Sequence, residues 1–130
     1  MKNAYYTVAS DDFTPGVYCL AKSINKVSNY RLNVISIDIC DKNKSLLESV
    51  GCKIIPVEYI GSKTCKPQKF RENPNFANNC YNKIHLWNQD YKKIIYFDAD
   101  IIFVKSIDHL FDLEHNFAAG SSFQTSYCIK

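Results

Sequence analysis

Ile94-Ile95-Tyr96-Phe97-Asp98-Ala99-Asp100 decides the fold, because bulky apolar residues lead directly into two carboxylates separated by one small residue. A short apolar run of this kind predicts a buried β-strand. In open α/β sheets, ligands bind at the carboxyl ends of such strands. We therefore expect the carboxylates of Asp98 and Asp100 at the ligand-binding edge of a sheet.

The N-terminal half of the chain alternates between strand and helix patterns. Thr14 and Pro15 mark the start of the first helix as its N-cap and first residue, and Gly51 marks the end of the second. Strands separated by single helices pair in parallel through right-handed crossovers, so the fold class is α/β with a mostly parallel sheet flanked by helices. The predicted order is a strand over 4–9, a helix over 15–27, a strand over 32–39, a helix from Asp41 to 50 and a strand over 53–57.

The C-terminal half begins with an irregular segment over 61–79 that carries Pro67, Pro74 and many polar residues. A long loop of this composition is usually functional or mobile. Helical spacing returns in the next segment. The predicted order is then a helix over 81–90, the strand over 94–97, a short β-like run over 101–104, a short helix over 107–111 capped by Ser106, and a final strand over 117–120.

Composition bounds the class of protein. A chain of 130 residues has the length of a single domain, and its net charge of +3 comes from scattered cations and no basic stripe. Nucleic acid is therefore not indicated, whereas a phosphate-bearing small molecule is compatible with a few placed cations. The six cysteines lack zinc-site spacing and are expected to be free thiols. We expect a cytoplasmic location and no transmembrane segment, because no secretory apolar region follows Met1 and every apolar run is short.

The two carboxylates suit a metal ion. One small residue lets the oxygens of Asp98 and Asp100 approach a common hard cation, Mn²⁺ or Mg²⁺, with phosphate oxygens completing the shell. Such an ion would neutralise a diphosphate leaving group. For the bare tripeptide, a turn residue followed by a solvated carboxylate is the commoner outcome. The apolar runs on both sides and the capped segment after Ser106 make the combination much rarer than the tripeptide.

The sequence resembles the glycogenin and galactinol-synthase type of retaining glycosyltransferases. The resemblance extends from Ala4 to about Gly120 and rests on four ordered pieces, each weak alone. They are Tyr6-Thr7-Val8-Ala9-Ser10-Asp11-Asp12-Phe13 with the following Gly16, then Asn82-Lys83-Ile84-His85-Leu86-Trp87, then the strand with Asp98-Ala99-Asp100, and then Asp108-His109-Leu110-Phe111. It implies a Rossmann-like nucleotide-diphospho-sugar transferase domain of the GT-A type, which binds a UDP-sugar and transfers the sugar with retention.

The resemblance gives the first strand and its turn a role in nucleotide binding. Val8, Ala9 and the turn from Asp11 to Phe13 would hold the uracil and ribose, with Phe13 in place of the usual stacking tyrosine. Val8 and Ala9 are also plain core residues under almost any model. Asp11 alone is as readily a turn residue as a ligand.

The resemblance gives the second set of residues a role at the phosphates and the metal. Lys83 would contact the sugar or phosphate, Asp98 would serve the ribose and the metal, Ala99 would touch the nucleotide through its backbone, and Asp100 would be a metal ligand. A helix lysine outside such a pattern is usually a solvated charge. The three histidines lack metal spacing with one another and are not assigned to the site.

The chain departs from the family at its C-terminal end. Family members continue well beyond this point, with an acceptor pocket and a later histidine that completes the metal shell, so the domain is expected to be C-terminally truncated. The acceptor stays unknown, and both a homodimer and a missing C-terminal half supplied by another chain stay open. The sequence offers no convincing nucleophile, so attack on the same face as the leaving group is the expected course.

Two other functions remain as alternatives. A catalytically inactive remnant or regulator would bind the nucleotide sugar without transferring it, and the first 120 residues do not distinguish it from an enzyme. A Mg²⁺-dependent phosphatase of the haloacid-dehalogenase type also places Asp-x-Asp after an apolar strand. In those enzymes the motif lies near the first strand and ends in Thr or Val, whereas here it begins at Asp98 and Ile102 takes the last position.

Overall fold

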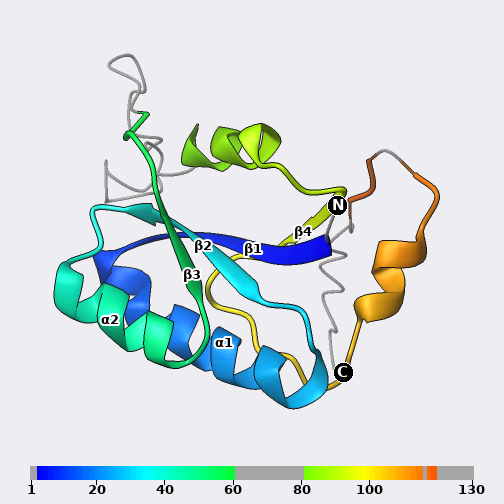
Figure 1. The fold of residues 1–130 in the computed structure, drawn as a ribbon, viewed down its shortest axis with the longest axis horizontal. Coiled ribbons are helices and arrows are strands. Elements are labelled where there is room, and N and C mark those ends of the chain that lie inside the picture. Colours follow the sequence, from blue (N-terminus) through cyan, green and yellow to red (C-terminus); the bar gives the residue numbers. More distant parts are fainter. Residues whose placement is uncertain (1–2, 61–80, 116, 120–130) are drawn as a thin grey trace, which may run out of the picture.

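One parallel sheet forms the centre of the protein (Figure 1). The computed structural model describes residues 3–60, 81–115 and 117–119. The sheet order is β3-β2-β1-β4, and all three strand pairs are parallel. The strands are β1 (Asn3–Ser10), β2 (Leu32–Ile37), β3 (Lys53–Pro56) and β4 (Lys93–Tyr96). The predicted α/β class with a mostly parallel sheet is confirmed.

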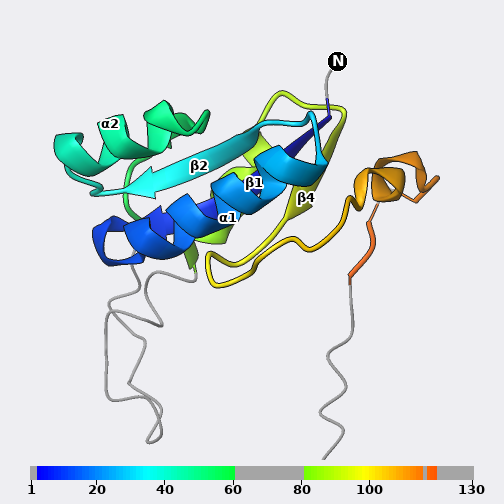
Figure 2. The same cartoon turned by 90° about the horizontal axis from the view of Figure 1, so that it is seen from below.

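Helices cover both faces of the sheet. Two α-helices, α1 (Thr14–Val27) and α2 (Asp41–Ser49), lie side by side on one face, and the 3₁₀ helix η2 (Tyr81–Asn88) lies on the other (Figures 1 and 2). Two shorter 3₁₀ helices are η1 (Asp11–Phe13), between β1 and α1, and η3 (Asp108–Asp112). Because alternate residues of β1 point to opposite faces, Tyr5 and Ala9 pack toward α1, whereas Ala4 and Tyr6 pack toward η2.

The larger core lies between the sheet and α1 and is centred on Tyr5. Its ring is fully buried and contacts four other aromatic rings with centroid distances of 5.1–6.1 Å. Edge-on and tilted rings at such distances attract through their quadrupoles in addition to the area they bury. The four partners are Tyr30, Phe97, Phe103 and Phe111. The residues that follow β4 are thereby held against the face that carries α1.

Two local predictions about the helices hold in modified form. Thr14 is the first residue of α1, not its N-cap, and its hydroxyl donates to the Asp11 carbonyl at 2.8 Å. Asp41 likewise begins α2, and Cys40 is the N-cap residue. Gly51 has a φ of +88°, the left-handed conformation that ends a helix at little cost only for glycine, as predicted.

Two element predictions are wrong among the described residues, and a third holds in modified form. The predicted helix over 81–90 is present as the 3₁₀ helix η2, which ends at Asn88. Residues 101–104 form no strand, because the Phe103 N–H is taken by the Ser23 hydroxyl at 3.0 Å and not by a neighbouring strand. Residues 117–119 also form no strand. The predicted loop over 61–79 and Gly120 lie outside the described residues.

Three cysteines are described, and all are free thiols as expected: Cys19, Cys40 and Cys52. Burial raises the pKa of the Cys52 thiol to about 12, so this side chain stays protonated and serves as a small core residue. The other three cysteines lie outside the described residues. No helix within the described ranges is long and apolar enough to span a membrane.

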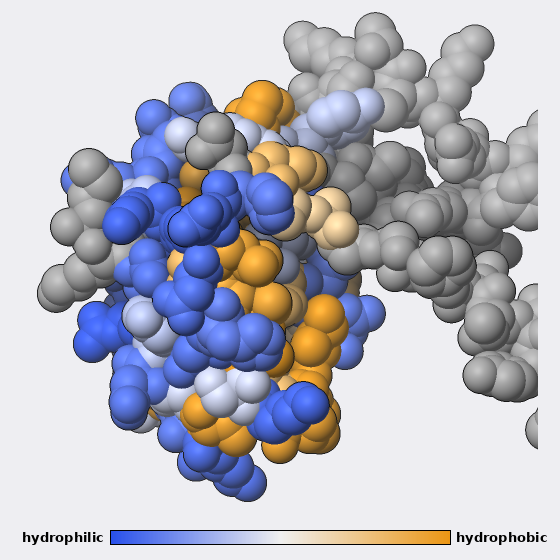
Figure 3. Space-filling view, turned by 90° about the vertical axis from the view of Figure 1, so that its right-hand side faces the viewer, coloured by the Kyte–Doolittle hydropathy of each residue, from blue (hydrophilic) through white to orange (hydrophobic). Residues whose placement is uncertain are grey.

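Several apolar side chains remain exposed after the sheet and helices have packed. Trp87 exposes 75% of its area, Ile102 65% and Val104 89%. Figure 3 shows, on one face of the protein, apolar surface in orange that breaks through the hydrophilic residues. The described part of the chain therefore does not cover all of its own apolar surface.

Candidate functional site

Two turns meet at one edge of the sheet. The turn at η1 follows β1 directly, and Asp98 to Asp100 follow β4. Since β1 and β4 are adjacent and parallel, their carboxyl ends lie at the same edge. The sheet order therefore brings the two groups of predicted site residues to the edge where α/β proteins bind ligands.

Lys83 and Asp98 form an ion pair at this edge. The Lys83 Nζ lies 3.0 Å from the Asp98 Oδ1, and it also lies 4.9 Å from the centroid of the Tyr96 ring. The Tyr96 hydroxyl donates to the same carboxylate oxygen at 2.5 Å. The lysine on η2 and the carboxylate after β4, predicted separately from the sequence, are thus brought into direct contact.

The ionisation of Asp98 follows from these contacts. Partial burial works to raise its pKa, but the hydrogen bonds from Tyr96 and Lys83 and the lysine charge outweigh burial. The pKa of Asp98 therefore lies below its ordinary value, and the side chain is a carboxylate at neutral pH. An anionic oxygen donor is the form that a hard divalent cation requires.

Ala99 and Asp100 differ in their exposure. Ala99 is buried, with 7% of its area exposed, whereas Asp100 is exposed to solvent. The Ala99 carbonyl oxygen lies so close to Gly16 of α1 that a Cβ on Gly16 would be only 2.6 Å from it. Asp100 is thus carried on a backbone that rests against the first turn of α1.

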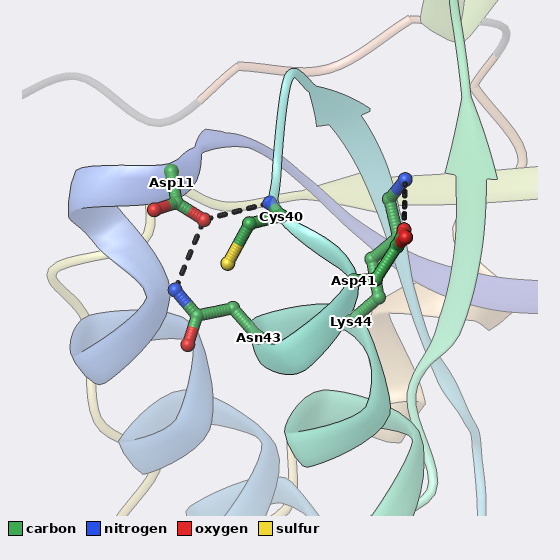
Figure 4. Close-up of polar contacts among 5 residues, drawn as sticks. All are labelled: Asp11, Cys40, Asp41, Asn43 and Lys44. Atoms are coloured by element: carbon green, nitrogen blue, oxygen red, sulfur yellow. Dashed lines mark hydrogen bonds and ion pairs between the residues drawn. The ribbon is translucent and has the colours of Figure 1, made fainter.

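Asp11 joins the turn after β1 to the start of α2 (Figure 4). Its Oδ1 accepts the Cys40 backbone N–H at 2.8 Å and the Asn43 side-chain amide at 2.9 Å. These hydrogen bonds, first that from the Cys40 backbone, lower the pKa of Asp11. The carboxylate that the resemblance assigns to the nucleotide thus also holds two loops together at the site edge.

The other predicted nucleotide-binding residues lie on β1 and in the same turn. Ala9 is buried in the core that contacts α1, and Val8 is half-buried on the opposite face of the sheet. Phe13 exposes 43% of its area, which leaves its ring available to a ligand. Their roles in nucleotide binding stay predictions.

We expect Asp11→Asn to lower the free energy of unfolding at pH 7. The native donors stabilise the charged carboxylate, so its folded pKa lies below the unfolded value of 3.8. This contribution is fully present above that value and is lost as the pH falls through the folded pKa. Urea titrations of both proteins at pH 7 and near pH 3 measure the free energies of unfolding. The difference between the wild type and Asp11→Asn should be smaller near pH 3.

The matched control is Asp12→Asn, because Asp12 is the exposed neighbour of Asp11 in the same turn. The control should leave the free energy of unfolding close to that of the wild type. A gap between Asp11→Asn and the wild type that stays constant with pH would show that the ionised carboxylate is not what holds the two loops.

A metal ion would find two protein ligands at this edge. Asp98 and Asp100 offer oxygens, the ligand type that Mn²⁺ and Mg²⁺ prefer, and both side chains are exposed. In the part of the chain that the structure describes, no three His, Cys, Asp or Glu side chains gather as a metal site. An ion held by these two carboxylates would need further ligands from elsewhere.

Two contacts at the site were missed by the sequence analysis. Tyr96 was assigned only to the strand, although residues two apart in extended chain point to the same side, which places Tyr96 beside Asp98. The bonds of Asp11 to Cys40 and Asn43 join turns 29 and 32 residues apart, and no local pattern signals them.

Comparisons with known proteins decide the family. The model of the family described as "Glycosyl transferase family 8" matches residues 6–128. This chain belongs to glycosyl transferase family 8. Among the relatives of this family 8 chain, galactinol synthase 4 of Arabidopsis thaliana is 36% identical over 117 residues, which cover 86% of this chain and 34% of that protein. Glycogenin of Neurospora crassa is 33% identical over 116 residues, which cover 85% of this chain and 17% of that protein.

A solved structure shows the same fold as the family 8 chain. The galactosyltransferase LgtC, crystallised with donor and acceptor sugar analogues, superimposes with a TM-score of 0.68 at 18% sequence identity. The match covers 85% of this chain and 42% of that one. The expected resemblance and the GT-A type of fold are thus confirmed. The chain spans about a third or less of the length of the curated relatives named above.

Proposed function

We propose that this chain forms the donor-binding part of a glycosyltransferase, which holds a UDP-sugar together with Mn²⁺ or Mg²⁺. In the complete protein, the sugar would pass to an acceptor with retention at the anomeric carbon. Membership of family 8 supports the reaction class. Between the alternatives left open by the sequence, the family assignment favours the transferase over the phosphatase.

The observation that carries the proposal is the meeting of two turns at one sheet edge. β1 and β4 are parallel neighbours, and the turn at η1 and the Asp98-Ala99-Asp100 turn follow them. The first turn offers an exposed aromatic ring at Phe13, and the second offers two exposed carboxylates with a lysine beside them. A nucleoside diphosphate has the matching parts, because its base stacks on rings and its phosphates bind cations and metal ions.

The residues would divide the work as follows. Asp98 and Asp100 would hold the metal ion, which supplies Lewis-acid stabilisation of the diphosphate when bound. Lys83 would bind the phosphates through its ammonium group, because its Nζ lies 3.0 Å from Asp98 and therefore beside the metal site. The base and ribose would lie beside Val8, Ala9, Asp11 and Phe13. The buried backbone at Ala99 would fix the separation of the two carboxylates.

Titration calorimetry of the purified protein with UDP tests the proposal. One series contains Mn²⁺ and the other EDTA. We expect saturable binding with Mn²⁺ and a large loss of affinity with EDTA, because the diphosphate reaches the two carboxylates only through an ion. Uridine, which lacks the phosphates, should bind weakly and equally in both series.

Binding of UDP that is equal with Mn²⁺ and EDTA would remove the metal from the proposal. Absence of binding in both series would remove the nucleotide site itself. Mn²⁺-dependent binding without sugar transfer would favour the alternative of a nucleotide-sugar-binding remnant or regulator.

The acceptor site would come from additional polypeptide. The longer relatives contain far more chain than the part matched here, and the exposed Trp87, Ile102 and Val104 would give such polypeptide an apolar surface to cover. A continuation of this chain, a second copy or a separate subunit would each provide that polypeptide.

Two expectations from the sequence stay predictions. They are the organisation of residues 1–130 as a single nucleotide-sugar-binding domain and the cytoplasmic location.

A further inference from the structure

The segment that follows Asp98 and contains Asp100 lies along α1. From Ala99 to Asp108 the chain runs in the same direction as the helix, beside it, as Figure 2 shows for the yellow and orange ribbon. Gly16 meets Ala99 near the start of the helix, and Ser23 meets Phe103 further along it. The Ser28 hydroxyl donates to Asp108 at 2.7 Å just beyond the helix end.

The pairing of β4 with β1 ends just before this segment. The Phe97 N–H donates to the Tyr6 carbonyl at 3.0 Å, which continues the pairing of β4 with β1 by one step. Asp98, Ala99 and Asp100 come after that bond and lie outside the strand. Beyond that bond, the Ala99 backbone lies against Gly16 of α1.

Gly16 makes the contact because it has no side chain. A Cβ there would lie 2.6 Å from the Ala99 oxygen and 3.5 Å from the Ala99 carbon, and a distance under 3.0 Å forces a shift. The atom in the way belongs to the backbone, so no side-chain rotation relieves the clash. The displaced group is the peptide that joins Ala99 to Asp100, so the shift reaches the Asp100 carboxylate directly.

Ser23 provides the second contact of this kind. Its hydroxyl is buried, donates to the Leu20 carbonyl at 2.7 Å and accepts the Phe103 N–H at 3.0 Å. One side chain thus satisfies its own helix and fixes the outgoing arm of the turn. A hydroxyl that only bonded back to its helix would fix nothing beyond it.

We propose that Gly16 and Ser23 are positioning residues, through which α1 sets the placement of the Asp98 and Asp100 carboxylates for a metal-bound diphosphate. The inference rests on the proposed function. Two carboxylates that share one Mg²⁺ must each lie about 2.0–2.1 Å from it. Asp98 comes directly after Phe97, whose N–H still bonds to Tyr6, so a shift at Ala99 changes the position of Asp100 relative to Asp98.

The test measures UDP affinity by calorimetry, with Mn²⁺ and with EDTA, for the wild type and for Gly16→Ala. We expect the affinity with Mn²⁺ to fall about tenfold or more, since displacements near 1 Å at a reacting site cost on the order of 100-fold. In EDTA, the UDP affinity of Gly16→Ala should equal that of the wild type. The ratio of the UDP affinity with Mn²⁺ to that with EDTA should therefore fall. A loss of fold would instead lower both affinities, so the ratio separates positioning from packing.

Ser23→Ala provides a second variant in case Gly16→Ala does not fold. It should lower the same ratio, by less than Gly16→Ala, because only the outgoing arm is released. Its matched control is Ser49→Ala, since the Ser49 hydroxyl also donates to a carbonyl three residues earlier in its helix, at 2.6 Å. Ser49 lies on α2, and the control should keep the wild-type ratio.

A wild-type ratio in both Gly16→Ala and Ser23→Ala would overturn the inference and leave the proposed function standing. Equal affinities with Mn²⁺ and EDTA in the wild type itself would overturn both. The stability of Gly16→Ala also discriminates, because alanine in a helix is favoured over glycine where space allows. A variant less stable than the wild type would show that the Ala99 carbonyl does resist the added methyl group.

Discussion

Replacing Asp100 by Asn is expected to abolish Mn²⁺-dependent binding of UDP while the protein stays folded. Asp100 is exposed, so an isosteric amide removes the charge without opening a cavity. Loss of groups that merely orient metal ligands costs about 10–100-fold in affinity, so loss of a direct anionic ligand should cost at least about 100-fold. Calorimetric titration of the variant with UDP and Mn²⁺ measures the loss.

Asp98→Asn should have a comparable effect on metal-dependent binding, with an added change in its neighbourhood. The amide keeps an oxygen for the Tyr96 hydroxyl but no longer balances the Lys83 charge, which lies 3.0 Å away. Asp90→Asn is the control, because Asp90 is an exposed aspartate between η2 and β4, outside the proposed site. Unchanged UDP affinity in Asp100→Asn would exclude Asp100 from the metal site.

The sheet could be predicted from sequence because its signals are local. The order of strands and helices through Pro56 follows from apolar runs, Thr14-Pro15 and Gly51, and each of these acts within a few residues. Parallel pairing then follows from the single-helix connections. The family resemblance contributed the type of fold, which the superposition on LgtC confirms.

The chain after β4 could not be predicted in the same way. Residues 101–104 have a strand-like composition, yet the structure places them beside α1, where Ser23 takes the Phe103 N–H. That outcome depends on a partner 80 residues away. Composition reports which residues suit a strand, but a strand also needs a neighbour with free hydrogen-bonding groups.

At the site, the sequence identified the residues but not their contacts. Lys83 and Asp98 were each predicted as site residues, and the ion pair between them appears only in three dimensions. The distance of Gly16 from Ala99 is likewise invisible in the sequence, since glycine in a first helical turn has no unusual backbone conformation to signal it. The packing of α1 against the turn brings Gly16 close to Ala99, and this contact is what a side chain at position 16 would disturb.

Replacing Tyr5 by Ala is expected to destabilise the protein by about 3–5 kcal/mol, the range for deleting a large buried ring. Tyr5 has 0% of its area exposed and contacts four aromatic rings, three of which belong to the chain after β4 that carries the site. Burial and the neighbouring Asp108 carboxylate raise the pKa of its hydroxyl, so this group stays protonated and donates to Asp108 at 2.5 Å. Denaturant unfolding measures the loss.

Tyr5→Phe separates the ring from the hydroxyl. It keeps the aromatic packing and removes one hydrogen bond to a carboxylate, which contributes about 1.5–3 kcal/mol in proteins, and the Ser28 hydroxyl remains bonded to Asp108. Tyr59→Ala is the control, because Tyr59 is 44% exposed and should cost within about 0.5 kcal/mol. If Tyr5→Ala cost no more than Tyr5→Phe, the hydroxyl and not the ring would hold η3 and the site segment to the sheet. A clearly larger loss for alanine would mean that the aromatic core joins them, so that the sheet and the two site carboxylates unfold as one unit.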